Sequence, residues 1–206
     1  MRSKSRQEQF WASSFGTEYT DRNTLPPEAR SPFFKAILEQ MKNVRTVCEL
    51  GSNRGHNLEA IKLAGKFDLT GVELNEDAHA ILSKIEGVNA VLSSIQDFEP
   101  VDRFDFVFVA GVLIHINPSD LPEIYAKMAS ISRKYVLLSE YFNPEPVEVP
   151  YRGHQGVLFK RDFAGEFLDA HPDFQVMDYG FKWKRVEPAW DNCCWFLLER
   201  RESDDR

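Results

Sequence analysis

The stretch CELGSNRGHN, residues 48–57, decides the fold of this chain. It closes a β-branched run over 44–50 and opens a helical pattern over 55–64. A strand that ends in a glycine turn and feeds a helix is typical of an open parallel α/β sheet, whose ligand crevice lies at this point. Gly51 and Gly55 allow a sharp turn and close approach of a ligand. A plain strand-to-helix turn without a ligand is the alternative.

Outward from this turn, strands and helices alternate. Helices are expected after Asn75, around 121–128 and over 161–170, and further strands over 67–74, 88–92, 104–111, 135–139, 174–181 and 192–198. The last two runs are joined by about ten residues, which predicts an antiparallel hairpin at the sheet edge. The sequence therefore predicts a Rossmann-like, seven-stranded, mostly parallel sheet with helices on both faces and an antiparallel C-terminal hairpin.

The residues before the first strand predict an N-terminal helical cap. Trp11, Phe15 and Tyr19 have helical spacing, which predicts a single helix over 7–19 with these rings on one face. A second helix is expected to start at Ser31, with this serine as its N-terminal cap. We expect residues 1–43 to form the cap and residues 44–206 to form the ligand-binding domain.

Composition and charge exclude several classes of protein. With 25 Lys and Arg against 32 Asp and Glu, the net charge of -7 disfavours a nucleic-acid partner, which needs a basic face. Three cysteines without a C-x-x-C spacing disfavour a disulfide framework or a zinc site and favour a reduced, cytoplasmic compartment. The N-terminus has no apolar stretch of a signal peptide, and the longest apolar run, 106–114, is about half a membrane span. We expect no membrane partner.

A carboxylate at the end of the second strand indicates the kind of ligand. Glu73 follows Gly51 by 22 residues, a spacing at which a carboxylate accepts both hydroxyls of a ribose. The dinucleotide fingerprint G-x-G-x-x-G and the Walker pattern are absent, and the observed E-x-G-x-x-x-G suits a ligand without a pyrophosphate. A solvated glutamate at a strand end is the alternative for Glu73.

Three motifs carry a resemblance to a known family. The segments ELGSNRGHN, GVELN and FDFVFVAGVLIHI resemble those of class I S-adenosylmethionine-dependent methyltransferases. FWASSFGTEYTDRN, NPEPVEVPYRGH and LFKRDFAGEF resemble the pseudaminic acid biosynthesis-associated methylases, over nearly the whole chain. The resemblance implies S-adenosylmethionine as the cofactor, no metal ion, and methyl transfer as the activity.

The resemblance also implies roles for particular residues. The methionine part of the cofactor would lie on the glycine turn, with Glu49 near its amino group; the positions implied here are Glu49, Gly51, Ser52, Asn53, Gly55 and Asn57. Glu73 would hold the ribose and Leu74 would pack on the adenine. Ser94 and Ile95 stand where the family usually has an acid for the adenine amino group, so Ser94 departs from the pattern. Ala110, Gly111 and Val112 would face the sulfonium.

Other candidates have structural alternatives. His115 is a candidate general base or a histidine packed beneath the cofactor. Tyr19 and Arg22 match the family's lid and are candidates for the cofactor carboxylate, although an aromatic stripe is more often core. The run from Lys182 to Arg185 reads as a hairpin edge protected by charge.

The proline-rich segment 141–161 is the expected acceptor site, because a long loop without periodicity in a compact domain is usually functional. Candidate substrate-binding residues are Tyr141, Tyr151, Arg152, His154 and Arg161, with Tyr151 and His154 also candidates for catalysis. This basic, aromatic set suits a small acidic or hydroxyl-rich acceptor, such as an acidic sugar or an amino-acid-like metabolite. A solvated loop is the alternative.

The sequence thus predicts a methyltransferase that acts on a small polar acceptor. Two other classes stay open: a nucleotide-dependent oxidoreductase, against which the missing fingerprint and the terminal hairpin argue, and a cofactor-binding module without catalysis. A macromolecular acceptor is disfavoured, since no extra recognition domain is visible. The identity of the acceptor, the nucleophile and the oligomeric state are left open by the sequence.

Overall fold

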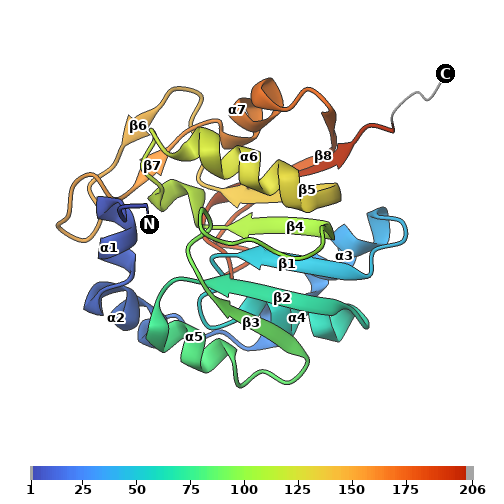
Figure 1. Cartoon of the computed structure of the whole chain (residues 1–206), viewed down its shortest axis with the longest axis horizontal. Coiled ribbons are helices and arrows are strands. Elements are labelled where there is room, and N and C mark those ends of the chain that lie inside the picture. Colours follow the sequence, from blue (N-terminus) through green and yellow to red (C-terminus); the bar gives the residue numbers. More distant parts are fainter. Residues whose placement is uncertain (1, 203–206) are drawn as a thin grey trace.

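A computed structural model describes residues 2–202 and contains the predicted seven-stranded sheet. The strand order is β3-β2-β1-β4-β5-β9-β8 (Figure 1). Five strands are parallel: β1 (Thr46–Leu50), β2 (Asp68–Glu73), β3 (Val88–Leu92), β4 (Phe104–Ala110) and β5 (Ser132–Glu140). The last two, β8 (Phe174–Lys182) and β9 (Cys193–Arg200), form the predicted antiparallel hairpin, with β9 paired to β5.

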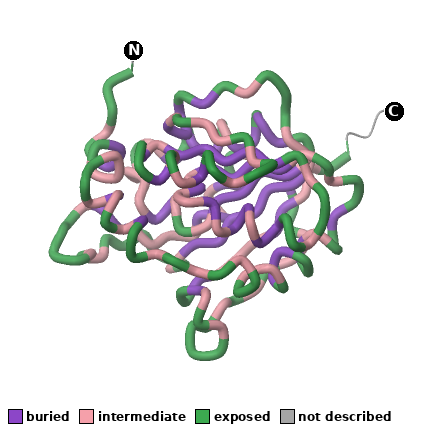
Figure 2. The backbone as a smooth tube through the Cα atoms, turned by 90° about the horizontal axis from the view of Figure 1, so that it is seen from below, coloured by how far each residue is buried: buried purple, intermediate pink, exposed green. Residues whose placement is uncertain are grey.

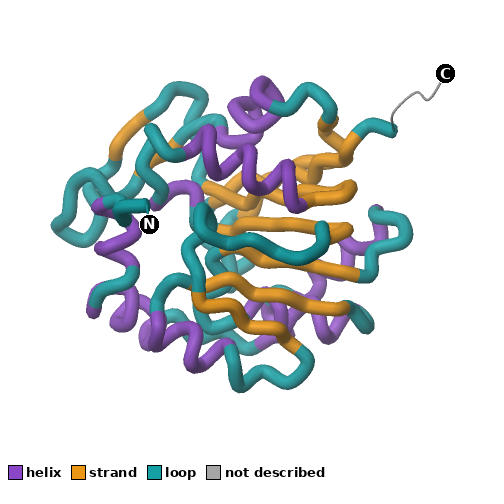
Figure 3. Tube along the Cα trace, in the orientation of Figure 1, coloured by secondary structure: helices purple, strands orange, loops and turns teal. Residues whose placement is uncertain are grey.

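Helices cover both faces of the sheet, as Figure 3 shows. One face carries α3 (Ser31–Gln40), α4 (His56–Ala64) and α5 (Glu76–Leu82), and the other carries α6 (Leu121–Ile131) and α7 (Phe163–Ala170). The central strands are buried on both sides (Figure 2), which explains their nearly continuous apolar sequences. Helix α3 is capped at Arg30 rather than at Ser31.

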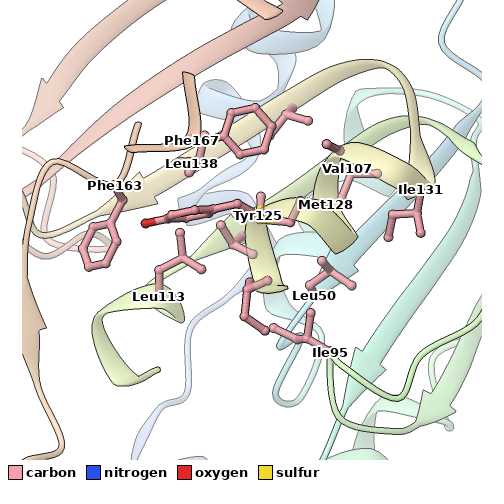
Figure 4. Close-up of a cluster of buried hydrophobic side chains, with 14 of the residues drawn as sticks. Leu50, Ile95, Val107, Leu113, Tyr125, Met128, Ile131, Leu138, Phe163 and Phe167 are labelled. Carbon is pink, nitrogen blue, oxygen red and sulfur yellow. The ribbon is translucent and has the colours of Figure 1, made fainter. Parts of the chain in front are cut away.

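The core between the sheet and α6 and α7 fixes the position of the strand ends (Figure 4). Tyr125, Met128 and Phe167 are buried there against Leu138 of β5. Burial of each such side chain stabilises the fold by about 1.5–3 kcal/mol. The sheet is therefore a rigid platform for the loops at its carboxyl edge.

The N-terminal cap consists of two helices, so the prediction of a single helix over 7–19 is wrong. Helix α1 (Arg6–Trp11) ends before Ser13, whose hydroxyl caps α2 (Ser14–Arg22). A side chain on Gly16 would place its Cβ 2.0 Å from the Trp11 carbonyl oxygen, so the two helices meet more closely than other residues allow. Both lie beside the carboxyl ends of the parallel strands (Figure 1).

Two connecting segments complete the fold. Segment 141–161 contains a short antiparallel pair, β6 (Val147–Glu148) with β7 (Phe159–Lys160), where the sequence predicts an unstructured loop. Short 3₁₀ turns lie at Pro27–Ala29 (η1) and Leu113–His115 (η2). All three cysteines are free, and Cys48 and Cys193 are buried. Between residues 2 and 202, every helix is too short or too polar to span a bilayer.

Candidate active site

A cavity of about 450 Å³ lies at the carboxyl ends of β1, β2 and β4. The N-terminal helices, segment 141–161 and the β8–β9 connection close it from the other sides. Ten of the residues predicted to hold the cofactor line it at the strand ends: Glu49, Gly51, Ser52, Asn53, Asn57, Glu73, Leu74, Ala110, Gly111 and Val112. The carboxyl ends of parallel strands meet at one edge, which explains why segments far apart in sequence share this cavity.

The glycine turn after β1 has the geometry that its sequence predicts. Gly51 has φ +76°, and a Cβ there would lie 2.6 Å from a methyl of Val112. Gly55, with φ +88°, packs against Ile85 and lies outside the cavity lining. Gly51 thus lets the turn approach the loop after β4, whereas Gly55 serves the packing of α4 on α5.

Glu49, the next-to-last residue of β1, has a buried carboxyl group with one unused oxygen. Asn57 Nδ2 donates a hydrogen bond to its Oε1 at 2.6 Å, while Oε2 is buried and has no partner. Burial raises the pKa of Glu49 to about 8, with Arg30 and Asn57 acting in the opposite direction. An unpaired carboxyl oxygen of a residue that lines a cavity is a binding position for a cation or a hydrogen-bond donor.

Glu73 ends β2 and orders the turns around it. Its Oε1 accepts hydrogen bonds from the backbone N–H groups of Leu74 at 2.9 Å and Asn75 at 2.8 Å, and its Oε2 accepts from Asn53 at 2.7 Å. Burial raises its pKa above the ordinary range despite these bonds. Since a carboxylate oxygen accepts two bonds, Oε2 keeps one position for a further donor.

Glu140, at the end of β5, supports the site from outside the cavity lining, and the sequence analysis did not identify it. Its Oε1 accepts hydrogen bonds from the backbone N–H groups of Val112 and Leu113, both at 3.0 Å. Burial raises its pKa to about 7. An acid directly after the buried run 135–139 was the available signal. Glu140 holds the loop that forms one wall of the cavity.

A wall of rings faces the strand ends. The ring of Trp11 lies 4.4 Å from that of His115 and 5.3 Å from that of Tyr19, and His115 lies 5.3 Å from Tyr151, centroid to centroid. These four residues line the cavity. The cap is held in place by Asn75, whose amide donates to the carbonyl oxygens of Trp11 and Ser13.

His115 is a neutral histidine in this wall. Its Nδ1 lies 2.6 Å from the Val157 carbonyl oxygen, which only accepts, so Nδ1 carries the proton and Nε2 has a free lone pair. Burial lowers the pKa of His115 to about 4. The ring can accept a hydrogen bond near neutral pH, but it is a weak base.

The cavity lining also contains Tyr141, Tyr151 and Arg152 of the predicted acceptor set, together with residues of the β8–β9 connection. Asp191 accepts a hydrogen bond from Tyr141 Oη at 2.8 Å and pairs with Lys184 Nζ at 2.8 Å. The prediction that Lys184 only protects a sheet edge is therefore wrong. The sequence offered no signal that this connection turns back over the strand ends.

Some predicted site residues lie elsewhere. Ser94 and Ile95 are buried outside the cavity lining, and Ser94 donates to Asp97 at 2.7 Å. His154 is exposed and packs on the rings of Phe10 and Phe15.

Two predicted arginines are already paired. Arg161 lies outside the lining and its Nε donates to Glu166 at 2.7 Å. Arg22 lines the cavity but is exposed and pairs with Glu18 at 3.4 Å. Within residues 2–202, no three His, Cys, Asp or Glu side chains form a cluster that could hold a metal ion.

Comparisons with known proteins agree with this geometry. The sequence matches the model of a family described as "Methyltransferase domain" over residues 22–174. Among solved structures, the 1,6-didemethyltoxoflavin-N1-methyltransferase of Burkholderia thailandensis, with bound S-adenosylhomocysteine, superposes with a TM-score of 0.72 at 17% identity, covering 98% of this chain and 93% of that one. A comparison with curated proteins finds no match.

Two further structures share the fold. The magnesium protoporphyrin IX methyltransferase of Synechocystis PCC 6803 superposes with a TM-score of 0.70 at 14% identity, covering 94% of this chain and 97% of that one. An amino pentose methyltransferase from Micromonospora echinaspora gives 0.66 at 13% identity, with 91% and 97% covered. These superpositions show a common fold. Because the family model spans more than half of the sequence, the chain belongs to the family of methyltransferase domains.

Proposed function

We propose that this protein transfers a methyl group from S-adenosylmethionine to a small polar acceptor. The observation that most directly supports this cofactor is the buried, unpaired Oε2 of Glu49 beside the Gly51 turn. This oxygen fits an ammonium group, and the open position on Glu73 Oε2 fits a ribose hydroxyl. Structures of similar fold were solved with S-adenosylmethionine or S-adenosylhomocysteine bound, which supports the same cofactor here.

The cofactor, when bound, supplies an activated methyl group on a sulfonium. The chain has to hold the two reactants in line and exclude water, which is catalysis by proximity. The loop after β4, held by Glu140, and the rings of Trp11, Tyr19 and Tyr151 form the walls that do so. His115 Nε2 is an acceptor for a hydroxyl or amino proton of the substrate, rather than a strong base.

The acceptor is a small molecule with acidic or hydroxyl groups, such as an acidic sugar or an amino-acid-like metabolite. Arg152 lines the cavity, lies over the Tyr151 ring at 5.7 Å, and pairs with no carboxylate within residues 2–202. Arg152 is exposed to solvent, and an acidic group on the acceptor would give its planar guanidinium a charge-assisted partner. The resemblance to pseudaminic acid biosynthesis-associated methylases and the fold shared with an amino pentose methyltransferase support a sugar.

Methyl transfer to a panel of acceptors tests the proposal. The wild-type protein with isotope-labelled S-adenosylmethionine should label a carboxylated or amino sugar, or an amino acid, in preference to an apolar phenol. Arg152→Ala should raise the KM of that acceptor at least tenfold, while the Kd of S-adenosylhomocysteine stays within twofold.

Arg185→Ala is the matched control, because Arg185 lies over the Trp183 ring and outside the cavity lining. Preference for an apolar acceptor, or unchanged kinetics of Arg152→Ala, would contradict the acceptor assignment. Cofactor binding without turnover on any acceptor would favour a non-catalytic module.

A further inference from the structure

We infer that Arg30 binds the carboxylate of the cofactor, so that Arg30 and Glu49 together recognise its zwitterionic amino-acid end. The inference rests on the proposed cofactor and assigns a residue that the motifs do not indicate. Arg30 stands before the first residue of α3 and lines the cavity together with Glu49.

Asn57 links Glu49 and Arg30 through its single amide group. Its Nδ2 donates to Glu49 Oε1 at 2.6 Å, and its Oδ1 accepts from Arg30 Nη1 at 2.8 Å. The partly buried guanidinium and the buried carboxyl group are thus held apart by a neutral side chain and do not form a direct ion pair. No salt bridge joins Arg30 to any carboxylate within residues 2–202.

The carboxyl group of Glu49 and the guanidinium of Arg30 both keep unused hydrogen-bonding positions. Glu49 Oε2 is buried without a partner. The guanidinium of Arg30 donates from Nε to the Ala189 carbonyl oxygen at 3.0 Å and from Nη1 to Asn57, and its Nη2 makes no hydrogen bond with the described residues. Burial lowers the pKa of Arg30, as expected for a cation that lacks an anionic partner.

A zwitterionic amino acid satisfies both positions at once. Its ammonium pairs with Glu49 and its carboxylate pairs with the planar donor fork of Arg30. Leaving a partly buried guanidinium and a buried carboxyl oxygen without partners is unfavourable, so a ligand that pairs with both is preferred over one that pairs with neither. The ring of Trp190, 4.4 Å from the Arg30 guanidinium, holds the cation in this orientation.

Arg22, which the sequence predicts as a ligand of the cofactor carboxylate, is placed less well for this role than Arg30. The side chain of Arg22 is 42% exposed and pairs with Glu18, one turn away on α2. A solvated ion pair of this kind contributes little to ligand binding. Arg22 therefore serves as the competing candidate in the test.

Calorimetric titration with two ligands separates the amino-acid end from the rest of the cofactor. S-adenosylhomocysteine carries the zwitterion, whereas 5′-deoxy-5′-methylthioadenosine has the nucleoside and thioether without it. Arg30→Met should weaken S-adenosylhomocysteine binding at least tenfold and change methylthioadenosine binding less than twofold. Arg30→Lys should recover part of the affinity, since it keeps the charge without the fork.

Arg45→Met is the control, because Arg45 is 83% exposed and pairs with Asp68 outside the cavity lining. Equal losses for both ligands in Arg30→Met, or a selective loss of S-adenosylhomocysteine in Arg22→Met alone, would overturn the inference. If the wild type binds S-adenosylhomocysteine and Arg30→Met binds it with the same affinity, only this inference is overturned. A wild-type protein that binds neither ligand would overturn the proposed cofactor as well.

Discussion

Glu140 at the end of β5 accepts a 3.0 Å hydrogen bond from the backbone N–H of Leu113, which follows β4. The same oxygen accepts from Val112 at the same distance, so one buried carboxylate holds the whole loop. Because the loop forms a wall of the cavity, the arrangement of the site depends on this single side chain.

Replacing Glu140 should destabilise the protein. Glu140→Ala leaves buried N–H groups without an acceptor, and we expect the free energy of unfolding to fall by about 2–4 kcal/mol. Urea denaturation measures this change. Glu140→Gln, which keeps one acceptor oxygen, should lose less. Exposed Glu123 on α6 provides the control, and a Glu140→Ala protein as stable as Glu123→Ala would refute the role assigned to Glu140.

The buried carboxylates should make stability fall as pH rises. The folded-state pKa of Glu49 is about 8 and that of Glu140 about 7, both above the ordinary value. A group with a raised folded pKa contributes its full stability below its unfolded pKa and loses it as pH rises through the folded pKa. Urea midpoints should therefore decrease between pH 5.5 and 8.5, and Glu140→Gln should reduce the slope. A slope that Glu140→Gln leaves intact would exclude this carboxyl as a source.

Cofactor binding should release a proton from Glu49. At pH 7 the free carboxyl is mostly protonated, with Arg30 lowering and Glu73 raising its pKa. An ammonium beside it stabilises the carboxylate form, so binding shifts the proton to the buffer. Titrations with S-adenosylhomocysteine in two buffers of different ionisation enthalpy should give different heats, and Glu49→Gln should remove the difference. Identical heats for the wild type would contradict the pairing.

His115 should stay neutral through the physiological range. Its pKa of about 4 reflects burial, which opposes the charged form. The ring signals of His115 in a nuclear magnetic resonance titration should stay constant from pH 8 to pH 5.5, and they are assigned by their loss in His115→Asn. A midpoint between pH 6 and 7 would restore His115 as a general base.

The ring of Trp11 should contribute to cofactor affinity. Trp11 lines the cavity and packs on Tyr19 and His115. Trp11→Leu should weaken binding of S-adenosylhomocysteine about tenfold, because it removes part of the wall and admits water. Phe10→Leu is a matched control on the same helix, since Phe10 lies outside the lining and contacts Trp11. Equal losses in both variants would assign Trp11 to packing alone.

The sheet and the cofactor face of the cavity were predictable from the sequence. Buried parallel strands have continuous apolar runs, and the residues that follow them must meet at one edge. The positions of Glu49, Gly51 and Glu73 therefore follow from local patterns and their spacing. The predicted helix over 7–19 failed because periodicity does not detect the close approach of Gly16 to the Trp11 carbonyl.

Only the tertiary structure placed Arg30, Lys184 and Asp191 in the cavity lining and showed that Glu140 holds the loop after β4. Arg30, Lys184 and Asp191 lie in segments whose sequence shows no ligand pattern, and they reach the site because a cap or connection folds back over the strand ends. The sequence by itself determined the order of the elements and the residues that end each strand, because hydrophobic periodicity and glycine turns act within a few neighbouring residues. The pairing of charges between distant segments was decided by packing, since burial and distance arise only when the whole chain is folded.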